Sequence, residues 1–523
     1  MKYIRYYIAI AFVVIFTRCQ DFEEIEKNPN QTITAPPSLI LTGIQNDMLE
    51  APWSLEHRWN QYWCCNYNYY GNNEYSWTNA TLKFQTLKNV LKMEEEALST
   101  GAKPLNPYAA LGKFFRAYFY VRMTQQVGDL PLEGALQGLE NSTPVYASQK
   151  DIYLQVLAWL ESANSDLTAL IAAGTPAPTS PLGDILSGDI YLGNSLQAWQ
   201  KIVNSFALRV LISLSKKESD ADLNIKNRFN AIVSNPVKYP LLTSAADNLQ
   251  IYYNGSTSLY PTNPGSRGLD KGRYNMAEMY VKTLTDLEDP RVFVTCNPAE
   301  AKLKAGIAFD SFDAYVGASS AESLDDMASE AGKGEYSYAN QLRYYGTYSG
   351  PEPALMVGYA EQNFNIAEAV NRGWITGDAE TFYKNGITAS MEVYGIKDGS
   401  SLKVTTADDA VLGEVTPSVT NYLNHVMVKY AGNNATGLTQ ILTQKYLAFF
   451  QNSGLEAYYN QRRTGVPAFR EGTGTGNNGV IPKRWLYPSA EETTNADNLN
   501  KAIQSQFGAM GDNKNAEIYS IKD

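Results

Sequence analysis

The sequence predicts a mainly α-helical fold that carries a large irregular, loop-rich insertion. Residues 107–128, 149–172 and 194–216 each repeat apolar residues at spacings of three and four, which is the period of one helix face. A Pro/Gly/Ser-rich segment, residues 173–184, separates the last two and predicts a loop. Residues 236–350 differ, because Gly and Pro interrupt them often and the periodic segments are short. We interpret this region as an insertion on the helical frame of one domain.

Residues 354–395 predict a pair of antiparallel helices. Gly373 suits the end of the first helix, and Asp378 lies near the start of the second. The apolar stripe of the second helix is Tyr383, Ile387, Met391 and Tyr394. Antiparallel helix pairs with small residues at the crossing are the unit that tetratricopeptide repeats stack. A further pair is expected at residues 437–463.

The chain begins with the features of an export signal. The apolar run from Ile8 to Phe16 is shorter than the roughly twenty residues that cross a bilayer. Cys19 follows directly, as in bacterial lipoproteins, and the acidic run behind it resembles the surface-export signal of Bacteroidetes lipoproteins. We therefore expect a signal peptide at residues 1–18, lipidation of Cys19, a tether at residues 19–38 and a domain at residues 39–523. An ordinary signal peptide with an incidental Cys is the alternative.

Charge and soft-ligand content exclude several function classes. The net charge is −11 and no block of Lys or Arg occurs, which argues against nucleic acid as a partner. Beyond Cys19 there are only Cys64, Cys65 and Cys296, so no disulfide framework is expected. The two histidines, His57 and His425, lie near no second soft ligand in the sequence. We expect no metal site.

Catalytic and cofactor motifs are also lacking. Residues 474–479, "GTGNNG", have the spacing of a pyrophosphate loop, but neither a predicted strand precedes them nor a predicted helix follows. No Gly-x-Ser-x-Gly motif occurs. Glycosidase chemistry needs only two carboxylates, so the sequence alone does not exclude it. We expect no catalytic residues and no cofactor.

Six motifs occur in an order that identifies a family. They are "DIYLGNSLQAWQKIVNSFALRVLISLS" (189–215), "YPLLTSAADNLQIYY" (239–253), "DLEDPRVFV" (286–294), "YAEQNFNIAEAVNRGWITGDAETFYKNGITASMEVYG" (359–395), "QKYLAFFQNSGLEAYYNQRRTGVPAF" (444–469) and "IPKRWLYP" (481–488). Together they resemble the SusD/RagB family of outer-membrane lipoproteins, in its SusD-like branch. The Arg462-Arg463 pair and Asp289-Pro290-Arg291 have structural interpretations, as a helix cap or ion pair and as a turn with a local ion pair.

The resemblance implies a fold, a location and a partner. The fold would be a superhelical frame of about four tetratricopeptide-like helix pairs. The protein would be anchored by lipid in the outer membrane, exposed at the cell surface, and would sit as a lid on a SusC-like TonB-dependent transporter. The family captures nutrients, usually oligo- or polysaccharides, and is not catalytic.

An aromatic run at residues 59–77 indicates where such a ligand would bind. It holds eight Trp or Tyr rings in nineteen positions, interleaved with Asn, Gln and Gly. Flat rings cover the C–H face of a sugar, and polar side chains pair with its hydroxyls. Helical spacing predicts that Trp59, Tyr62 and Trp63 are core residues. We predict ligand contacts at Asn66, Tyr67, Tyr69, Tyr70, Tyr75 and Trp77, and in a second Tyr-rich run at Tyr344 and Tyr345, with core or transporter interface as the alternative.

Two other function classes stay open at this point. A surface glycoside hydrolase would turn over a polysaccharide, whereas a binder would not. A structural or adhesive surface lipoprotein would lack a transporter gene beside its own.

Overall fold

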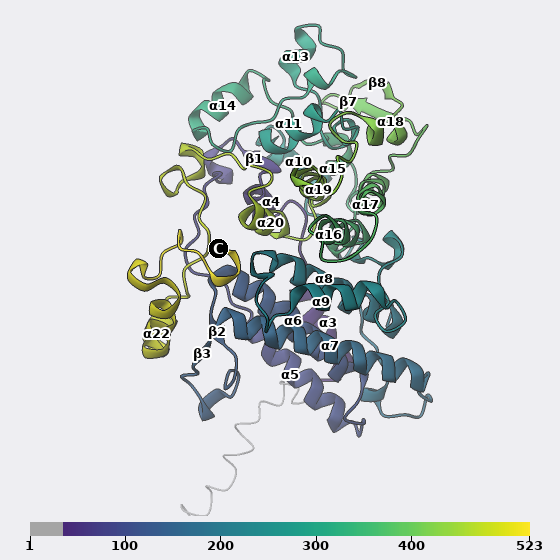
Figure 1. The fold of residues 1–523 in the computed structure, drawn as a ribbon. Coiled ribbons are helices and arrows are strands. Elements are labelled where there is room, and N and C mark those ends of the chain that lie inside the picture. The colour runs from purple at the N-terminus through teal and green to yellow at the C-terminus, as the bar shows by residue number, and fades with distance from the viewer. Residues whose placement is uncertain (1–34) are drawn as a thin grey trace, which may run out of the picture.

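The computed structural model describes residues 35–523, so the expected signal peptide, Cys19 and most of the tether lie outside the described residues. Helices dominate the regular structure, and the strands are short and paired in twos (Figure 1). The prediction of a mainly helical fold is therefore confirmed. Within this part of the chain, no helix is both long and apolar enough to cross a membrane.

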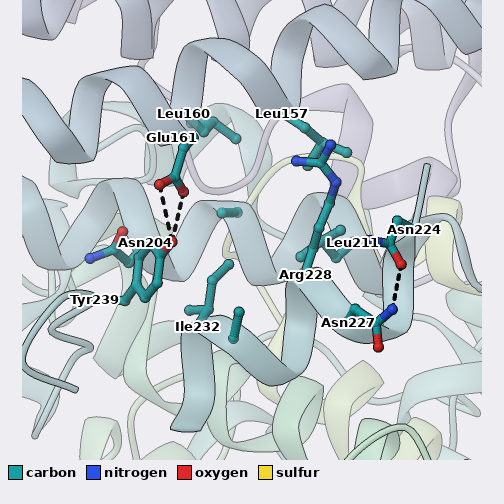
Figure 2. Close-up of a pocket in the computed structure, with 12 residues that line it drawn as sticks. Leu157, Leu160, Glu161, Asn204, Leu211, Asn224, Asn227, Arg228, Ile232 and Tyr239 are labelled. Atoms are coloured by element: carbon teal, nitrogen blue, oxygen red, sulfur yellow. Dashed lines mark hydrogen bonds between the residues drawn. The ribbon is translucent and has the colours of Figure 1, made fainter. Parts of the chain in front are cut away.

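The N-terminal half of the chain forms a run of helices in which each packs against the next. Its members are α3 (Pro37–Asp47), α5 (Phe84–Ser99), α6 (Pro107–Val127), α7 (Gln149–Ala173), α8 (Leu196–Ser213) and α9 (Ile225–Ser234). Asn106, Ser148 and Ser195 cap α6, α7 and α8 by accepting a backbone N–H of the first turn. The three long helices predicted from periodicity are confirmed. Both α7 and α9 pack on α8, and a groove remains between them (Figure 2).

A second group of helices comes from the C-terminal half of the chain. It consists of α16 (Tyr359–Asn371), α17 (Ala379–Val393), α19 (Ala435–Ala448) and α20 (Glu456–Thr464). α16 lies at its centre and packs against α17, α19 and α8. Gly373 takes a left-handed φ of 72° just after α16, and the Asp378 side chain accepts the N–H of Glu380 at the start of α17.

Both predicted C-terminal helix pairs are confirmed, with one correction at residues 354–357. These residues form β6 (Ala354–Val357), which pairs antiparallel with β4 (Leu249–Ile251). All four side chains of β6 are buried; the strand packs against β4 and α8, and the Ser453 hydroxyl just before α20 donates to the Met356 carbonyl at 3.1 Å. A short apolar run of this kind does not distinguish strand from helix by periodicity.

Residues 236–350 contain only short elements. They are β4, α10 (Pro264–Asp270), β5 (Tyr274–Met276), α11 (Glu278–Asp286), α12 (Arg291–Thr295), α13 (Glu300–Lys304), α14 (Leu324–Gly332) and α15 (Gln341–Tyr345). Most of this region lies at the top of Figure 1, beside β7 (Leu402–Thr405), β8 (Val411–Val415) and α18 (Val419–Asn424). Side chains link these pieces. Asn297, for example, donates to the Thr405 carbonyl at 2.7 Å and accepts the N–H of Gln341 at 2.9 Å.

The last two α-helices are α21 (Glu491–Thr494) and α22 (Ala496–Phe507), and α22 packs on β3 (Tyr146–Ala147) of the small pair that β3 forms with β2 (Leu130–Pro131). After α22 the chain ends in a 3₁₀ turn, Tyr519–Ile521, that packs on α7. The Gly-rich residues 474–479 precede α21 and form two short 3₁₀ turns. No strand leads into these turns and no α-helix follows them directly. Their surroundings are therefore not those of a pyrophosphate loop.

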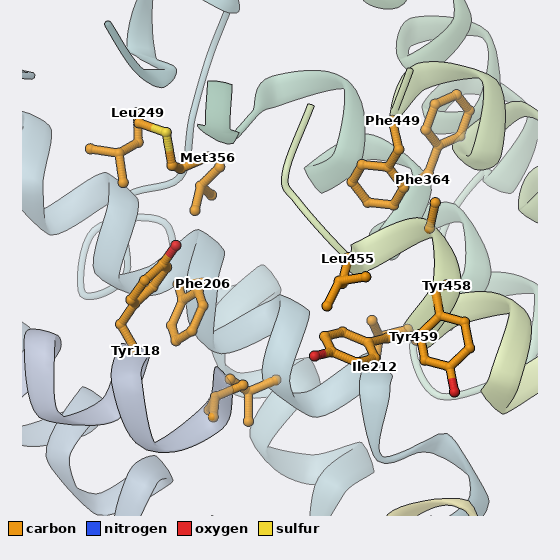
Figure 3. Close-up of a cluster of buried hydrophobic side chains, with 14 of the residues drawn as sticks. Tyr118, Phe206, Ile212, Leu249, Met356, Phe364, Phe449, Leu455, Tyr458 and Tyr459 are labelled. Atoms are coloured by element: carbon orange, nitrogen blue, oxygen red, sulfur yellow. The ribbon is translucent and has the colours of Figure 1, made fainter. Parts of the chain in front are cut away.

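One contiguous core joins the two helix groups. Figure 3 shows Tyr118 of α6 and Phe206 of α8 on one side, below Met356, and Leu455, Tyr458 and Tyr459 on the other. Buried apolar area of this kind is the main favourable contribution to folding. The two helix groups therefore pack on each other through a shared interior, and such interiors are packed as densely as organic crystals.

Two buried ion pairs hold α16, one across the same boundary to α8 and one within the C-terminal helix group to α20. Glu361 of α16 accepts from Nε and Nη2 of Arg209 on α8, at 2.6 and 2.5 Å. Glu368, two turns further along α16, accepts from both Nη atoms of Arg463 on α20, at 2.5 and 2.9 Å. Burial opposes the charge on Glu368, but Arg463 outweighs it and the pKa of this carboxyl falls to about 2. The pair is therefore ionised at neutral pH.

Arg462 and the Asp289-Pro290-Arg291 turn have structural roles as well. Arg462 donates to the carbonyls of Gln125 and Lys483 at 3.0 and 2.5 Å. Arg291 pairs with Asp289 inside the turn, as the sequence predicts, and both side chains are fully buried. The same guanidinium reaches Ser390 and Gln444, so it also holds α17 and α19.

The Arg463–Glu368 pair gives a test of the fold. We expect Arg463→Met to lower the free energy of unfolding by about 3–5 kcal/mol, because Glu368 would stay buried without its main partner. Urea denaturation at neutral pH measures this change. Lys384→Met serves as the control, since Lys384 pairs with Glu380 at the surface and such a pair contributes roughly 0–1 kcal/mol. Equal effects of the two substitutions would contradict the role given to Glu368.

Candidate functional site

The aromatic run at residues 59–77 forms a loop on a rigid neck. It follows α4 (Leu55–Trp59) and enters β1 (Trp63–Cys65), which pairs antiparallel with β5. Asn73 closes the neck, because its amide accepts the N–H of Cys65 at 2.8 Å and donates to the carbonyl of the same residue at 2.9 Å. Gly71 makes the turn with a φ of 115°, and a Cβ there would lie 3.0 Å from Nη1 of Arg58. The loop tip, residues 67–70, projects from this neck.

Three tyrosines at the loop tip reach solvent. Tyr69 is 84% exposed and Tyr67 is 47% exposed, while Tyr70 is half-buried. The Tyr70 ring lies 5.3 Å from that of Tyr69 and 6.1 Å from that of Tyr67, between ring centroids. The guanidinium carbon of Arg273 lies 4.5 Å from the Tyr67 centroid. We call Tyr67, Tyr69, Tyr70, Arg273 and Tyr274 the tyrosine platform.

The platform combines apolar faces with hydrogen-bond donors. Arg273 has no carboxylate partner among residues 35–523, so its N–H groups are available to a ligand. Burial raises the pKa of Tyr274 to about 12, so its hydroxyl stays protonated at neutral pH and can donate. The Tyr274 ring packs against Tyr70 at 6.3 Å, edge to face, and supports it from below. The arrangement suits a ligand with an apolar face and a rim of hydroxyls.

The sequence did not lead us to predict Arg273 and Tyr274 as residues of the site. The only local signal is an Arg-Tyr pair after a Gly, in "KGRYNM", which many loops share. What brings these residues to the platform is the pairing of Cys65 with Tyr274 in the β1–β5 ladder. That contact joins positions about two hundred residues apart.

Tyr75 and Trp77 are not ligand contacts, which corrects the prediction. Each is only 1% exposed. Residues 74–78 are extended, so side chains alternate between solvent and core. Trp77 stacks on Trp485 at 3.6 Å between ring centroids, and the Tyr75 hydroxyl donates to the Trp59 carbonyl at 2.5 Å. Aromatic and polar residues alternate from Glu74 to Thr78, and this pattern in the sequence could have predicted that the two rings are buried.

Asn66, Tyr344 and Tyr345 are buried too, so the prediction is wrong for them as well. Asn66 belongs to the neck, where it donates to Asn275 Oδ1 at 2.7 Å. Tyr344 and Tyr345 lie on the inner side of α15, and Tyr344 packs edge to face on Trp53 at 4.7 Å. The short helix α15 turns these two rings toward the core, whereas Tyr348 of the same run stays 45% exposed.

The predicted core residues of the run are largely confirmed. Tyr62 and Trp63 are buried, and Tyr62 stacks on Tyr446 of α19 at 4.8 Å. Trp59 is only partly buried, although it packs edge to face on Trp77. Its indole N–H donates to the Glu74 carbonyl at 3.1 Å.

The titratable groups near the neck are held in unreactive states. Burial lowers the pKa of His57 to about 4, so this imidazole is neutral. Burial also raises the pKa of Cys64 to about 12, which keeps it a thiol rather than a nucleophilic thiolate. Between residues 35 and 523, no three His, Cys, Asp or Glu side chains gather as a metal site would require.

Known proteins resemble this chain in sequence and in fold. A family model described as SusD-like, "starch-binding associating with outer membrane", matches residues 29–488. A SusD homologue from Bacteroides fragilis NCTC 9343 is 30% identical, with a TM-score of 0.78 over 93% of this chain and 100% of the other. An outer-membrane protein from Bacteroides vulgatus ATCC 8482, which its description connects with nutrient binding, is 30% identical with a TM-score of 0.77 over 93% and 100%.

More distant structures share the fold alone. A chitin-binding SusD homologue from Flavobacterium johnsoniae is 19% identical, with a TM-score of 0.67 over 93% of this chain and 99% of the other. Among curated proteins, none shows significant similarity to this chain.

The division of the rings between tip and core can be tested by stability. We expect Trp77→Ala to lower the free energy of unfolding by about 3–5 kcal/mol, because it removes a buried ring stacked on Trp485. Tyr69→Ala should change it by no more than about 0.5 kcal/mol, as is usual for an exposed side chain. Chemical denaturation monitored by circular dichroism measures both. A large loss in Tyr69→Ala would show that this ring is structural.

Proposed function

Because the chain belongs to the SusD-like family of outer-membrane nutrient-binding proteins, we propose that it captures an oligo- or polysaccharide at the cell surface and passes it to a SusC-like TonB-dependent transporter. Proteins of this family bind without catalysis, so the chain is not an enzyme. The observation that carries the proposal is the tyrosine platform on its rigid neck.

The chemistry of the platform favours a glycan. A sugar ring offers one C–H face to an aromatic ring and hydroxyls at its edge. Tyr69 and Tyr67 are exposed, and Arg273 lies over one face of the Tyr67 ring with its N–H groups unpaired in the described residues. Tyrosine also loses little conformational entropy on binding, because it has only two side-chain torsions. One sugar unit can therefore stack on a tyrosine ring and accept hydrogen bonds from Arg273 at the same time.

The rigidity of the neck favours binding as well. The hydrogen bonds of Asn73 and Asn66 fix the loop before a ligand arrives. A preorganised site avoids the cost of ordering loops and side chains on binding. The chitin-binding homologue from F. johnsoniae supports a glycan as the ligand class, since its fold is similar.

The proposal extends to the anchor and the partner, which membership of the family supports. We propose that residues 1–18 are removed, that Cys19 carries the lipid and that residues 19–38 tether a single domain, residues 39–523, to the outer membrane. The pairs α3/α5, α6/α7, α8/α9 and α16/α17 would be the tetratricopeptide-like units of the frame, since each is formed by neighbouring packed helices. This frame would act as a lid on the SusC-like transporter.

The platform gives the first functional test. On a panel of immobilised glycans that includes chitin and starch fragments, we expect saturable binding to at least one member and no product release. Tyr67→Ala and Tyr69→Ala should each weaken that binding by about tenfold or more, because loss of a central aromatic contact costs about 1–2 kcal/mol or more. Tyr252→Ala is the matched control, since Tyr252 is 67% exposed and lies outside the platform. Normal binding by both platform variants would place the glycan elsewhere, and turnover would contradict a pure binder.

The lipid anchor gives the second test. In cells that lack the transporter, we expect Cys19→Ala to leave the outer-membrane fraction, because the lipid would be the only remaining attachment. Fractionation followed by immunoblotting measures this. Cys65→Ala serves as the control cysteine change, since it leaves the signal sequence intact. Full retention of Cys19→Ala in the membrane would contradict lipid anchoring.

A further inference from the structure

Arg273 of the tyrosine platform and the neighbouring Arg58 have no carboxylate partner in residues 35–523. Most other arginines of these residues form an ion pair with a carboxylate. Arg267, on α10 just before the platform, pairs with Asp409 at 2.6 and 2.7 Å. The chain has a net charge of −11, so its carboxylates outnumber its cations. Two unpaired guanidiniums at one place are therefore not explained by a shortage of carboxylates.

The two guanidiniums lie at the ends of a row of aromatic rings. The guanidinium carbon of Arg58 lies 4.7 Å from the Trp63 ring centroid, and Trp63 packs edge to face on Tyr274 at 4.8 Å. Tyr274 packs on Tyr70 at 6.3 Å, and the guanidinium carbon of Arg273 lies 6.0 Å from the Tyr70 centroid. Tyr70 and Tyr274 are partly exposed. Between the two positive charges, the row therefore borders solvent.

Arg58 is held in place but is not fully satisfied. Its Nη1 donates to the Asn72 carbonyl at 2.7 Å, which fixes the guanidinium beside the turn at Gly71. Its Nε is buried without an acceptor, and its Nη2 donates to no group in residues 35–523. Burial lowers the pKa of Arg58, although a guanidinium stays charged at neutral pH. A partly buried charge without a counter-ion is unfavourable, and a bound anion would relieve this.

The electrostatic effects of the two arginines overlap at the neck of the loop. Burial raises the pKa of the Cys65 thiol, and both Arg58 and Arg273 oppose that shift. The carboxylate that acts on Tyr274 is Asp270, which forms an ion pair with neither arginine in the described residues. The row of rings is thus flanked by two positive charges that no nearby carboxylate neutralises.

We propose that the tyrosine platform takes a glycan that carries carboxylate or sulfate groups. This inference rests on the proposed function, since it names the ligand class of the same platform. The rings would stack on C–H faces of the sugar, and anionic groups of the glycan would pair with Arg58 and Arg273. A neutral glycan also accepts hydrogen bonds from a guanidinium, but it leaves the two charges without counter-ions. Charge complementarity therefore favours the acidic ligand.

Paired ligands test the charge by calorimetric titration of the purified protein. One pair is tetragalacturonate and its methyl ester, and the other is a sulfated galactose tetrasaccharide and its desulfated form. We expect at least one acidic ligand to bind about tenfold or more tightly than its neutral counterpart, because hydrogen bonds between charged groups are the stronger ones. The pair that shows this preference distinguishes carboxylate from sulfate. Raising NaCl from about 0.05 to about 0.5 M should weaken the acidic ligand only.

Substitutions test which cations carry the preference. Arg58→Gln and Arg273→Gln should each weaken the acidic ligand by about tenfold and reduce its advantage over the neutral counterpart. Lys271→Gln is the matched control, because it removes one positive charge two residues before Arg273, where exposed Lys271 already pairs with Asp408. It should change the affinity by less than about twofold, as expected for a screened surface charge.

The outcomes separate this inference from the proposed function. Equal or tighter binding of both neutral counterparts would overturn the inference, as would equal losses in all three variants. Binding of a neutral glycan from the panel, with neither acidic ligand bound, would overturn the inference and leave the proposed function intact. Failure of every glycan to bind would overturn both. The comparison of paired ligands uses the unaltered protein, so it stands even if a variant fails to fold.

Discussion

Two carboxylates buried on one helix, Glu361 and Glu368, fix α16 against a neighbouring helix of each of the two helix groups. They are seven residues apart, about two helical turns, so both leave α16 from the same side. One meets Arg209 of α8 and the other meets Arg463 of α20, and α8 and α20 also pack on each other. A buried ion pair adds little net stability over an apolar contact, but a shifted register would leave a charge buried alone, at about 3–5 kcal/mol. We infer that these pairs select one arrangement of the helices.

That arrangement extends to the tyrosine platform through α19 and α20. Asn60 donates to the Gly454 carbonyl at 2.7 Å and accepts the N–H of Tyr458 on α20 at 3.0 Å. The Tyr62 hydroxyl donates to the Tyr446 carbonyl of α19 at 2.6 Å. The residues before β1 are therefore attached to α20, which Glu368 positions through Arg463, and to α19, which packs on α16. A site that needs its rings in fixed positions gains from such support, because misplaced contacts bind weakly.

Helix positions could be predicted from the sequence more fully than the site. Apolar spacing, caps and glycines are local signals, and they located α6, α7, α8, α16 and α17. The site depends on contacts between distant residues, such as Cys65 with Tyr274, which no local pattern carries. Composition was also misleading, because Tyr344 and Tyr345 lie in a polar run whose short helix turns them inward. β6 was missed for a third reason, since a short apolar run fits either helix or strand.

One stretch of chain divides its rings between core and surface, and the backbone decides which ring goes where. Before the neck, Tyr62 and Trp63 point into the core; after it, the extended segment sends Tyr75 and Trp77 inward in alternation. Between the two, Asn66 and Asn73 tie the neck together by buried hydrogen bonds to Gly272, Asn275 and Cys65. The loop tip therefore cannot fold back onto the core without breaking buried hydrogen bonds, each with a penalty of about 1–3 kcal/mol. Exposed apolar rings are kept in solvent by buried polar residues, which is the arrangement expected where a surface serves binding rather than packing.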